Sequence, residues 1–297
     1  MLLDKTFDCS GWEIHYKIIE SSPALAHSAQ QTLVVVHGTP WSSIVFDAIS
    51  AALLASTPNL HILLYDLPGY GQSQYYSGAQ QFRDFDGDTS VAFQATALVA
   101  LLEETRISNP LVVAHDIAGA IVLRAHTLHS LELKSLLLMD TNTVLPWGDG
   151  FYKLVRANPS VFLDMPPQIH EGVVRSVIRS ACHHTVPQQM EDALAAPWLG
   201  AEGQRNFVRQ IAQANDADVQ EMLDCRAYEG KVTCAVKVLW GEVDGWIPRG
   251  KMETLVEMLG TARCGEGLVI VPEAGHLLMI DQPERVALEV GEWVRSA

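Results

Sequence analysis

Four polar residues in this sequence have the types and surroundings that nucleophilic catalysis requires. Asp116 stands where an apolar run, residues 111–114, gives way through His115 to a helix-like stretch. His37, Asp244 and His276 each follow another short apolar run. A carboxylate that attacks saturated carbon forms an ester, which water can cleave, whereas a serine would form an ether that resists water. The expected chemistry is therefore covalent hydrolysis at a saturated carbon, with Asp116 as the nucleophile.

The other residues have complementary roles in such a reaction. His276 is expected to act as general base on the water that cleaves the ester, with Asp244 orienting its ring. Asp140 also ends a strand-like run, and it stays open as the alternative acid. The backbone N–H groups of Ile117 and of a residue near Thr39 are expected to bind the oxyanion.

Each assignment has a simpler structural rival. Asp116 suits the N-cap of a helix, His276 an ordinary loop, and Asp244 a solvated turn. Nucleophile, acid and histidine nevertheless follow one another in the order that triads of this kind use. Because all of these segments end strand-like runs, we favour the catalytic interpretation.

The elements that must position these residues alternate between strands and helices. Continuous apolar runs at 32–36, 61–66, 111–115, 135–140, 235–240 and 268–271 predict buried parallel strands, and residues 3–19 predict an antiparallel hairpin. Helices are predicted over 45–55, 89–105 and 118–127. Alternation of this kind predicts an α/β fold with its site at the carboxyl ends of the strands.

The rhythm changes after the sixth predicted strand. Residues 145–228 contain no strand pattern, but helices are predicted near 171–182, 187–195 and 204–215. The expected organisation is a core of residues 1–144 and 229–297, with residues 145–228 as a helical cap, or lid, over the site.

Composition restricts the partners. The chain of 297 residues carries a formal net charge of −15, which opposes binding to nucleic acid or to an anionic membrane. It has no signal-peptide pattern and no apolar run of roughly 18 residues, the length of a membrane span. Its five cysteines are scattered, which favours reduced thiols in a cytoplasmic protein. We expect a monomer or homodimer that uses water and a small apolar organic substrate, with no cofactor and no metal.

With these residues in hand, the chain resembles the α/β-hydrolase superfamily over nearly its whole length. The His115-Asp116 turn, the segment Leu-Pro-Gly-Tyr-Gly-Gln-Ser at 67–73 and the pair Gly275-His276 carry the resemblance. The turn looks like the aspartate form of the nucleophile elbow found in epoxide hydrolases and in haloalkane and fluoroacetate dehalogenases. The resemblance implies an α/β-hydrolase fold, a mostly parallel eight-stranded sheet flanked by helices with the cap inserted after the sixth strand.

The chain departs from the dehalogenase patterns at the positions that bind the leaving group. Haloalkane dehalogenases usually have Trp directly after the nucleophile and often Asn in the His-Gly-x-Pro loop, where this chain has Ile117 and Thr39. Fluoroacetate dehalogenases have Arg at the positions of Ile117 and Ala120. His37 is expected to support the oxyanion loop, and Trp41 is a candidate donor in this region. Other candidate donors or walls of the substrate pocket are Trp147, Tyr152 and Trp198.

Epoxide hydrolases typically carry cap tyrosines that protonate the epoxide oxygen. The predicted cap offers Tyr152 and Tyr228 at its edges, with His170, His183 and His184 as other acids. An epoxide needs one proton donor of several possible types, so the sequence favours an epoxide hydrolase-like reaction. The alternatives are hydrolysis of a carbon–halogen bond, a lyase, isomerase or cyclase reaction in the same pocket, and a ligand-binding sensor without turnover.

Overall fold

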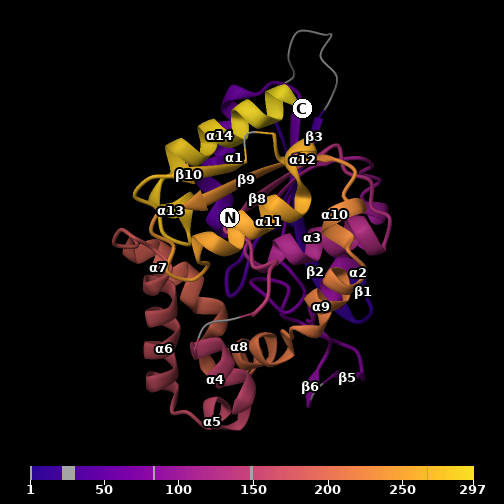
Figure 1. Cartoon of the computed structure of the whole chain (residues 1–297). Coiled ribbons are helices and arrows are strands. Elements are labelled where there is room, and N and C mark those ends of the chain that lie inside the picture. Colours follow the sequence, from indigo (N-terminus) through magenta and orange to yellow (C-terminus); the bar gives the residue numbers. More distant parts are fainter. Residues whose placement is uncertain (1, 22–30, 83, 148–149, 266) are drawn as a thin grey trace.

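An eight-stranded sheet lies at the centre of the structure, a computed structural model that describes residues 2–21, 31–82, 84–147, 150–265 and 267–297 (Figure 1). The strand order is β1-β2-β4-β3-β7-β8-β9-β10. The strands are β1 (Lys5–Cys9), β2 (Trp12–Glu20), β3 (Gln31–Val36), β4 (Leu60–Tyr65), β7 (Leu111–His115), β8 (Ser135–Met139), β9 (Ala235–Gly241) and β10 (Leu268–Val271). Only β1 and β2 run antiparallel to their neighbours, so the predicted edge hairpin and parallel strands are confirmed.

The central strands are apolar on both sides because helices cover both faces of the sheet. Every residue of β7 and β8 is buried. Helix α1 (Asp47–Ser56) packs beside α14 (Pro283–Ser296), and α2 (Val91–Glu104) packs beside α3 (Ile117–Leu128) on the opposite face (Figure 1). Shorter elements complete the core, namely η1 (Ser43–Phe46), α11 (Arg249–Leu259), α12 (Thr261–Cys264) and α13 (Leu278–Asp281).

Two local features differ from the sequence prediction. The helix predicted over 89–105 begins at Val91 as α2, and its cap is Ser90, whose Oγ accepts from the Phe93 N–H at 3.2 Å. Asp88 accepts from the Ser90 N–H at 2.8 Å and thus fixes the capping residue. The segment 78–88, for which no strand was predicted, contains a short antiparallel pair, β5 (Gln81–Phe82) and β6 (Phe85–Asp86).

The chain between β8 and β9 is helical in its described part, as predicted. Helices α4 (Gly150–Ala157), α5 (Pro159–Leu163), α6 (Pro167–Ser180), α7 (Gln188–Ala195), η2 (Ala196–Trp198) and α8 (Gly200–Gln213) lie together at the lower end of Figure 1. Helices α9 (Ala217–Asp224) and α10 (Ala227–Gly230) return to the core, where Glu221 pairs with Arg124 of α3 at 2.6 Å. The division of the chain at residues 144 and 229 stays a prediction.

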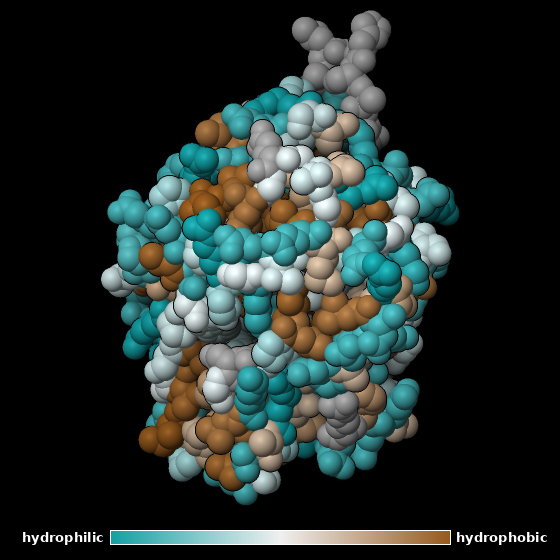
Figure 2. Space-filling model, viewed as in Figure 1, coloured by the Kyte–Doolittle hydropathy of each residue, from teal (hydrophilic) through white to brown (hydrophobic). Residues whose placement is uncertain are grey.

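Figure 2 shows polar residues over much of this face and apolar residues in several patches, one of them at the lower left over helices that follow β8. Leu154, Val161 and Ile169, on α4, α5 and α6, are each more than half exposed. Within the described residues, no helix combines the length and apolarity needed to cross a bilayer. The five cysteines are free thiols.

Candidate active site

Asp116 lies at a strained turn between β7 and α3. Its backbone has φ 54° and ψ −125°, a region that residues other than glycine rarely occupy. Its N–H donates to the Met139 carbonyl at 3.1 Å, and its own carbonyl accepts from the N–H groups of Gly119 and Asn142, each at 3.1 Å. The side chain makes no helix-capping hydrogen bond, so the N-cap interpretation does not account for it. The turn therefore presents the carboxyl group at the carboxyl edge of the sheet.

Small residues allow the chain to pass close to this turn. A Cβ atom added at Gly119 would lie 2.6 Å from the Thr141 side chain, and one at Gly38 would lie 2.5 Å from Asp116 Cβ and 2.8 Å from Oδ2. All three distances are shorter than the contacts that real Cβ atoms make. The side chains that the added Cβ atoms would contact are closely packed and cannot move freely. Glycine at position 38 thus lets the Thr39 loop reach the carboxyl group.

We expect Gly38→Ala to reduce both stability and activity. The added methyl group must displace Asp116 or the loop, at a cost of about 1–3 kcal/mol of unfolding free energy. A displacement near 1 Å in a catalytic group reduces turnover by about 100-fold. Thermal unfolding and steady-state kinetics measure the two effects. Gly172→Ala on the exposed side of α6, where nothing lies within 4 Å, is the matched control. An active, equally stable Gly38→Ala protein would contradict this packing argument.

The Asp116 carboxyl group is buried and contacts backbone donors. Asp116 is 3% exposed, and its Oδ2 accepts from the Thr39 N–H at 2.9 Å. Burial raises the pKa of Asp116, although the nearby His276 and the backbone N–H groups of Thr39 and Ile117 oppose the rise. These two N–H groups are the ones predicted for the oxyanion, and the structure places both at one carboxyl group.

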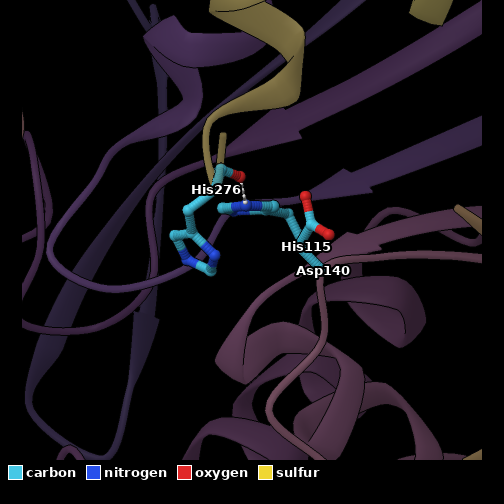
Figure 3. A group of neighbouring side chains, drawn as sticks. All are labelled: His115, Asp140 and His276. Atoms are coloured by element: carbon cyan, nitrogen blue, oxygen red, sulfur yellow. Dashed lines mark hydrogen bonds between the residues drawn. The ribbon is translucent and has the colours of Figure 1, made fainter. Parts of the chain in front are cut away.

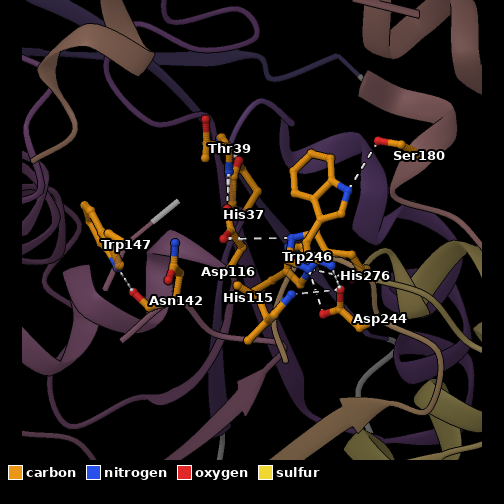
Figure 4. Close-up of polar contacts among 12 residues, drawn as sticks. His37, Thr39, His115, Asp116, Asn142, Trp147, Ser180, Asp244, Trp246 and His276 are labelled. Carbon is orange, nitrogen blue, oxygen red and sulfur yellow. Dashed lines mark hydrogen bonds and ion pairs between the residues drawn. The ribbon is translucent and has the colours of Figure 1, made fainter. Parts of the chain in front are cut away.

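His276 lies between two carboxylates (Figure 4). Its Nδ1 is 3.0 Å from Asp244 Oδ2, and its Nε2 is 3.8 Å from Asp116 Oδ1. Asp244 is fixed in turn, because its Oδ1 accepts from the N–H groups of Trp246 at 2.7 Å and Ile247 at 3.1 Å. Burial lowers the pKa of His276, but the charge and hydrogen bond of Asp244 and the charge of Asp116 outweigh it and leave the pKa above its usual value.

Trp246 is a member of this site that the sequence analysis did not identify. Its ring stacks on His276 with centroids 4.8 Å apart and planes at 17°, and its Nε1 donates to Ser180 Oγ of α6 at 3.3 Å (Figure 4). The indole therefore covers the histidine and joins it to the helices after β8. Its position two residues after Asp244 was the available signal.

Asp140, the alternative acid, lies behind the site and not on His276 Nδ1. Its Oδ1 accepts from the Gly241 N–H at 2.9 Å, whereas Oδ2 is buried without a hydrogen-bond partner among the described residues. Burial raises the pKa of Asp140 well above its usual value, and the charges of Asp244 and Asp116 raise it further. This carboxyl group thus favours its neutral form.

Figure 3 shows the group formed by His115, Asp140 and His276, whose nearest donor atoms all lie within 4.8 Å. His115 Nε2 lies 2.8 Å from the His276 carbonyl oxygen and must donate to it, because a carbonyl only accepts. Burial, followed by the charge of His276, lowers the pKa of His115 well below its usual value. A metal ion here would require an ionised Asp140, which its surroundings disfavour. The donors therefore fit a metal poorly, and His115 serves as a support for the His276 loop.

The two acids give a matched pair of variants. We expect Asp140→Asn to change the turnover rate by less than about fivefold, because an amide resembles the neutral acid. Asp244→Asn removes the charge that orients His276, and turnover should fall by on the order of 10⁴. Steady-state kinetics on both proteins decides between the acids. The reverse ranking would place the triad acid at position 140.

The raised pKa of Asp140 also predicts a pH-dependent effect on stability. An unfolded aspartate ionises near pH 4, whereas folding disfavours ionisation of this group, so the wild-type protein loses stability as the pH rises above about 4. Asp140→Asn removes this penalty. The variant should therefore melt at a higher temperature than wild type at pH 7, with the difference shrinking toward pH 4. A constant difference at all pH values would contradict this assignment.

A cavity of about 300 Å³ opens onto Asp116. Thr39 and Ile117 line it, as do Trp147 and Tyr152, two of the predicted pocket residues. The structure adds residues that the sequence analysis did not identify, namely Asn142, Arg156 and Lys251. They come from the loop after β8, from α4 and from α11, segments with no local motif.

Other predicted residues lie outside the cavity lining. Trp198 donates from Nε1 to the Pro40 carbonyl at 2.8 Å and so contacts the oxyanion loop from outside. Trp41 is buried beside Trp246, with ring centroids 5.7 Å apart. His37 accepts from the Leu67 N–H at 2.9 Å, in agreement with a role in supporting the loop.

Helix α8 contacts the oxyanion loop through Gln210, another residue absent from the sequence analysis. The side-chain oxygen of Gln210 accepts from the Thr39 hydroxyl and, at 3.1 Å, from the Tyr70 hydroxyl. All three side chains are buried. The helices after β8 thus touch the site at Thr39 as well as at Trp246.

Comparison with known proteins identifies relatives along almost the whole chain. The alpha/beta hydrolase family profile matches residues 33–290. An alpha/beta hydrolase fold protein from Burkholderia ambifaria is 33% identical, with a TM-score of 0.83 over 98% of this chain and 97% of that one. A haloalkane dehalogenase from Bradyrhizobium elkani USDA94 is 19% identical, with a TM-score of 0.77 over 98% and 97%. The pimeloyl-[acyl-carrier protein] methyl ester esterase of Pectobacterium carotovorum is 22% identical over 271 residues, 87% of this chain and 92% of the esterase.

Proposed function

The chain belongs to the alpha/beta hydrolase family, and from that premise we propose that it is an epoxide hydrolase-like enzyme that works through an ester on Asp116. The observation that carries the proposal is the position of the Asp116 carboxyl group. It lies at the elbow with Oδ2 on the Thr39 N–H and Oδ1 facing His276. This arrangement supports two successive steps.

In the first step, Asp116 Oδ1 attacks a carbon of the epoxide ring. The carbon–oxygen bond of the ring breaks, and the departing oxygen takes a proton from Tyr152, which lines the same cavity. The product is an ester between Asp116 and the opened substrate. Its carbonyl oxygen, Oδ2, is already beside the Thr39 N–H.

In the second step, water attacks the ester carbonyl carbon. His276 Nε2 takes a proton from that water, and Asp244 stabilises the charged ring. The N–H groups of Thr39 and Ile117 bind the oxyanion that forms. Collapse releases the diol, whose leaving oxygen takes the proton from His276. The remaining acidic proton of Asp116 returns to Tyr152 through solvent, which restores the enzyme.

The aspartate at position 116 also argues against an esterase reaction in this chain, the activity named for the relative from Pectobacterium carotovorum. Carboxylate attack on an ester carbonyl would give an anhydride, a poorer intermediate than the acyl ester that serine forms. Attack on saturated carbon instead gives a stable ester for His276 to hydrolyse. The residue type at position 116 therefore supports an alkyl substrate.

A halide is the second candidate leaving group, and one observation favours it. The Asn142 side chain lines the cavity beside Asp116, and a side-chain amide is a donor suited to a departing anion (Figure 4). Tyr152 has an acidic hydroxyl that can protonate an alkoxide, which an amide cannot do. We therefore place the epoxide first.

Single turnover in ¹⁸O-labelled water tests the proposal. The oxygen that cleaves the ester enters the Asp116 carboxylate, so a peptide containing residue 116 should gain ¹⁸O during the first turnover. Racemic styrene oxide and 1-bromobutane serve as probes of the two leaving groups. The product of this first turnover should be unlabelled, because its new oxygen comes from Asp116. Labelled product from either probe without label on Asp116 would refute the ester mechanism, and unlabelled product without label on Asp116 would indicate an isomerase or lyase.

A further inference from the structure

We propose that the substrate carries a carboxylate, bound at the cavity wall by Arg156 of α4 and Lys251 of α11. This inference rests on the proposed function, because it names the class of molecule that reaches Asp116. The reacting end would be the apolar epoxide, and the anionic end would lie against the two cations. The substrate is thus amphipathic and not wholly apolar.

Arg156 has hydrogen-bond donors to spare. Its Nη2 donates to the Trp147 carbonyl at 3.2 Å, and a guanidinium carries five N–H groups. The side chain is partly buried and lines the same cavity as Asp116. A guanidinium in this position can bind a carboxylate through two parallel hydrogen bonds.

Lys251 of α11 also lines this cavity. Its Nζ donates to the carbonyl of Pro146, which directly precedes Trp147 in the sequence. Two ammonium protons remain for a ligand. Burial lowers the pKa of Lys251, the nearby charge of Lys153 lowers it further, and Asp216 opposes this. A bound carboxylate would relieve both the burial and the repulsion.

Neither cation is paired with an acid in the part of the chain that the structure describes. Ion pairs within 4.0 Å occupy many other arginines and lysines, but not Arg156 or Lys251. In a chain with a net charge of −15, the described lining of this cavity thus carries two cations that have no acid within 4.0 Å among the described residues. Among the described residues of the cavity lining, Asp116 is the one acidic side chain.

The two cations would also offset the repulsion between an anionic substrate and the Asp116 carboxylate. The carboxylate of Asp116 repels a second anion, and this repulsion is strong where water is excluded. Positive charge on the cavity wall offsets the repulsion and orients the molecule with its uncharged end toward Asp116. The competing interpretation is purely structural, in which both cations only bind the carbonyl groups of residues 146 and 147.

Binding of butanoate and its uncharged analogue butanamide, measured by isothermal titration calorimetry, separates these interpretations without any turnover. We expect butanoate to bind the wild-type protein at least tenfold more tightly, since charge-assisted hydrogen bonds are about twice as strong as neutral ones. Arg156→Met and Lys251→Met should each weaken butanoate binding by about tenfold and leave butanamide unchanged. Arg156→Lys should give a smaller loss than Arg156→Met, because it keeps the charge but not the two parallel hydrogen bonds. Lys231→Met, which removes an exposed charge from outside the cavity lining, is the matched control.

Equal affinity for the two ligands, or an equal loss in Lys231→Met, would overturn the carboxylate site. A second measurement keeps this result separate from the proposed function. His276→Gln protein is incubated with 4,5-epoxypentanoate or its amide, and the intact mass is recorded. Equal adducts from both probes would refute the carboxylate site and support the ester chemistry. Selective butanoate binding with no adduct from either probe would refute the ester chemistry and support the site.

Discussion

Replacing His276 with Gln is expected to stop turnover after the first step and to leave the substrate attached to Asp116. Glutamine keeps much of the volume and can donate to Asp244, but it cannot take a proton from water at neutral pH. Attack by Asp116 does not require this base, so the ester forms and persists. General-base catalysis contributes about 10²–10⁴ in rate, so hydrolysis of the ester should slow by at least that factor.

Intact-protein mass spectrometry after incubation with the epoxide measures this adduct, and peptide mapping locates it. The mass should rise by that of the whole epoxide, since ring opening loses no atoms. His129→Gln, an exposed histidine just after α3, is the control and should turn over normally without an adduct. An inactive His276→Gln protein that binds substrate but never carries the added mass would indicate a sensor or a non-covalent reaction.

Asp116→Asn is expected to abolish turnover while preserving the fold. Asparagine fits the positive φ of residue 116, and its side-chain oxygen can still accept from the Thr39 N–H. The amide is not a nucleophile, and removal of a covalent nucleophile costs on the order of 10⁶ in turnover. The His276→Gln adduct must also disappear when both substitutions are combined.

Stability distinguishes this catalytic role from a structural one. Burial raises the pKa of Asp116, so its ionised form destabilises the folded protein at pH values above the usual carboxyl range. Asp116→Asn should therefore melt at the same or a higher temperature than wild type at pH 7. A marked fall in melting temperature would instead indicate that Asp116 stabilises the turn.

Much of the fold was predictable from the sequence because parallel strands covered on both faces must be apolar throughout. Residues 111–115 and 135–139 are buried along their whole length, and their predicted bounds agree with β7 and β8 within a residue. The turn at Asp116 was also predictable from the sequence, because close packing of α3 on the sheet requires small residues such as Gly119 beside the turn. Strand burial and turn geometry of this kind depend on residues that are adjacent in the sequence, so the sequence predicts them.

Only the tertiary structure decided which distant groups meet. Asp140 and Asp244 both follow strands, and the sequence favoured Asp244 but left Asp140 open as the alternative acid. In the structure the Gly241 N–H holds Asp140 behind the site, while Asp244 reaches His276 Nδ1. Trp246 stacks on His276 because the loop after β9 turns back over the histidine loop.

The charged residues that line the cavity could not be predicted from the sequence either. Arg156 and Lys251 are 95 positions apart in a chain rich in solvated charges, and neither stands in a motif. The sequence thus determined the fold and predicted the type of nucleophile, because both depend on neighbouring residues and on periodic burial. The structure alone decided the partner of the histidine and the charge of the cavity, because these depend on how loops from separate elements converge at one edge of the sheet.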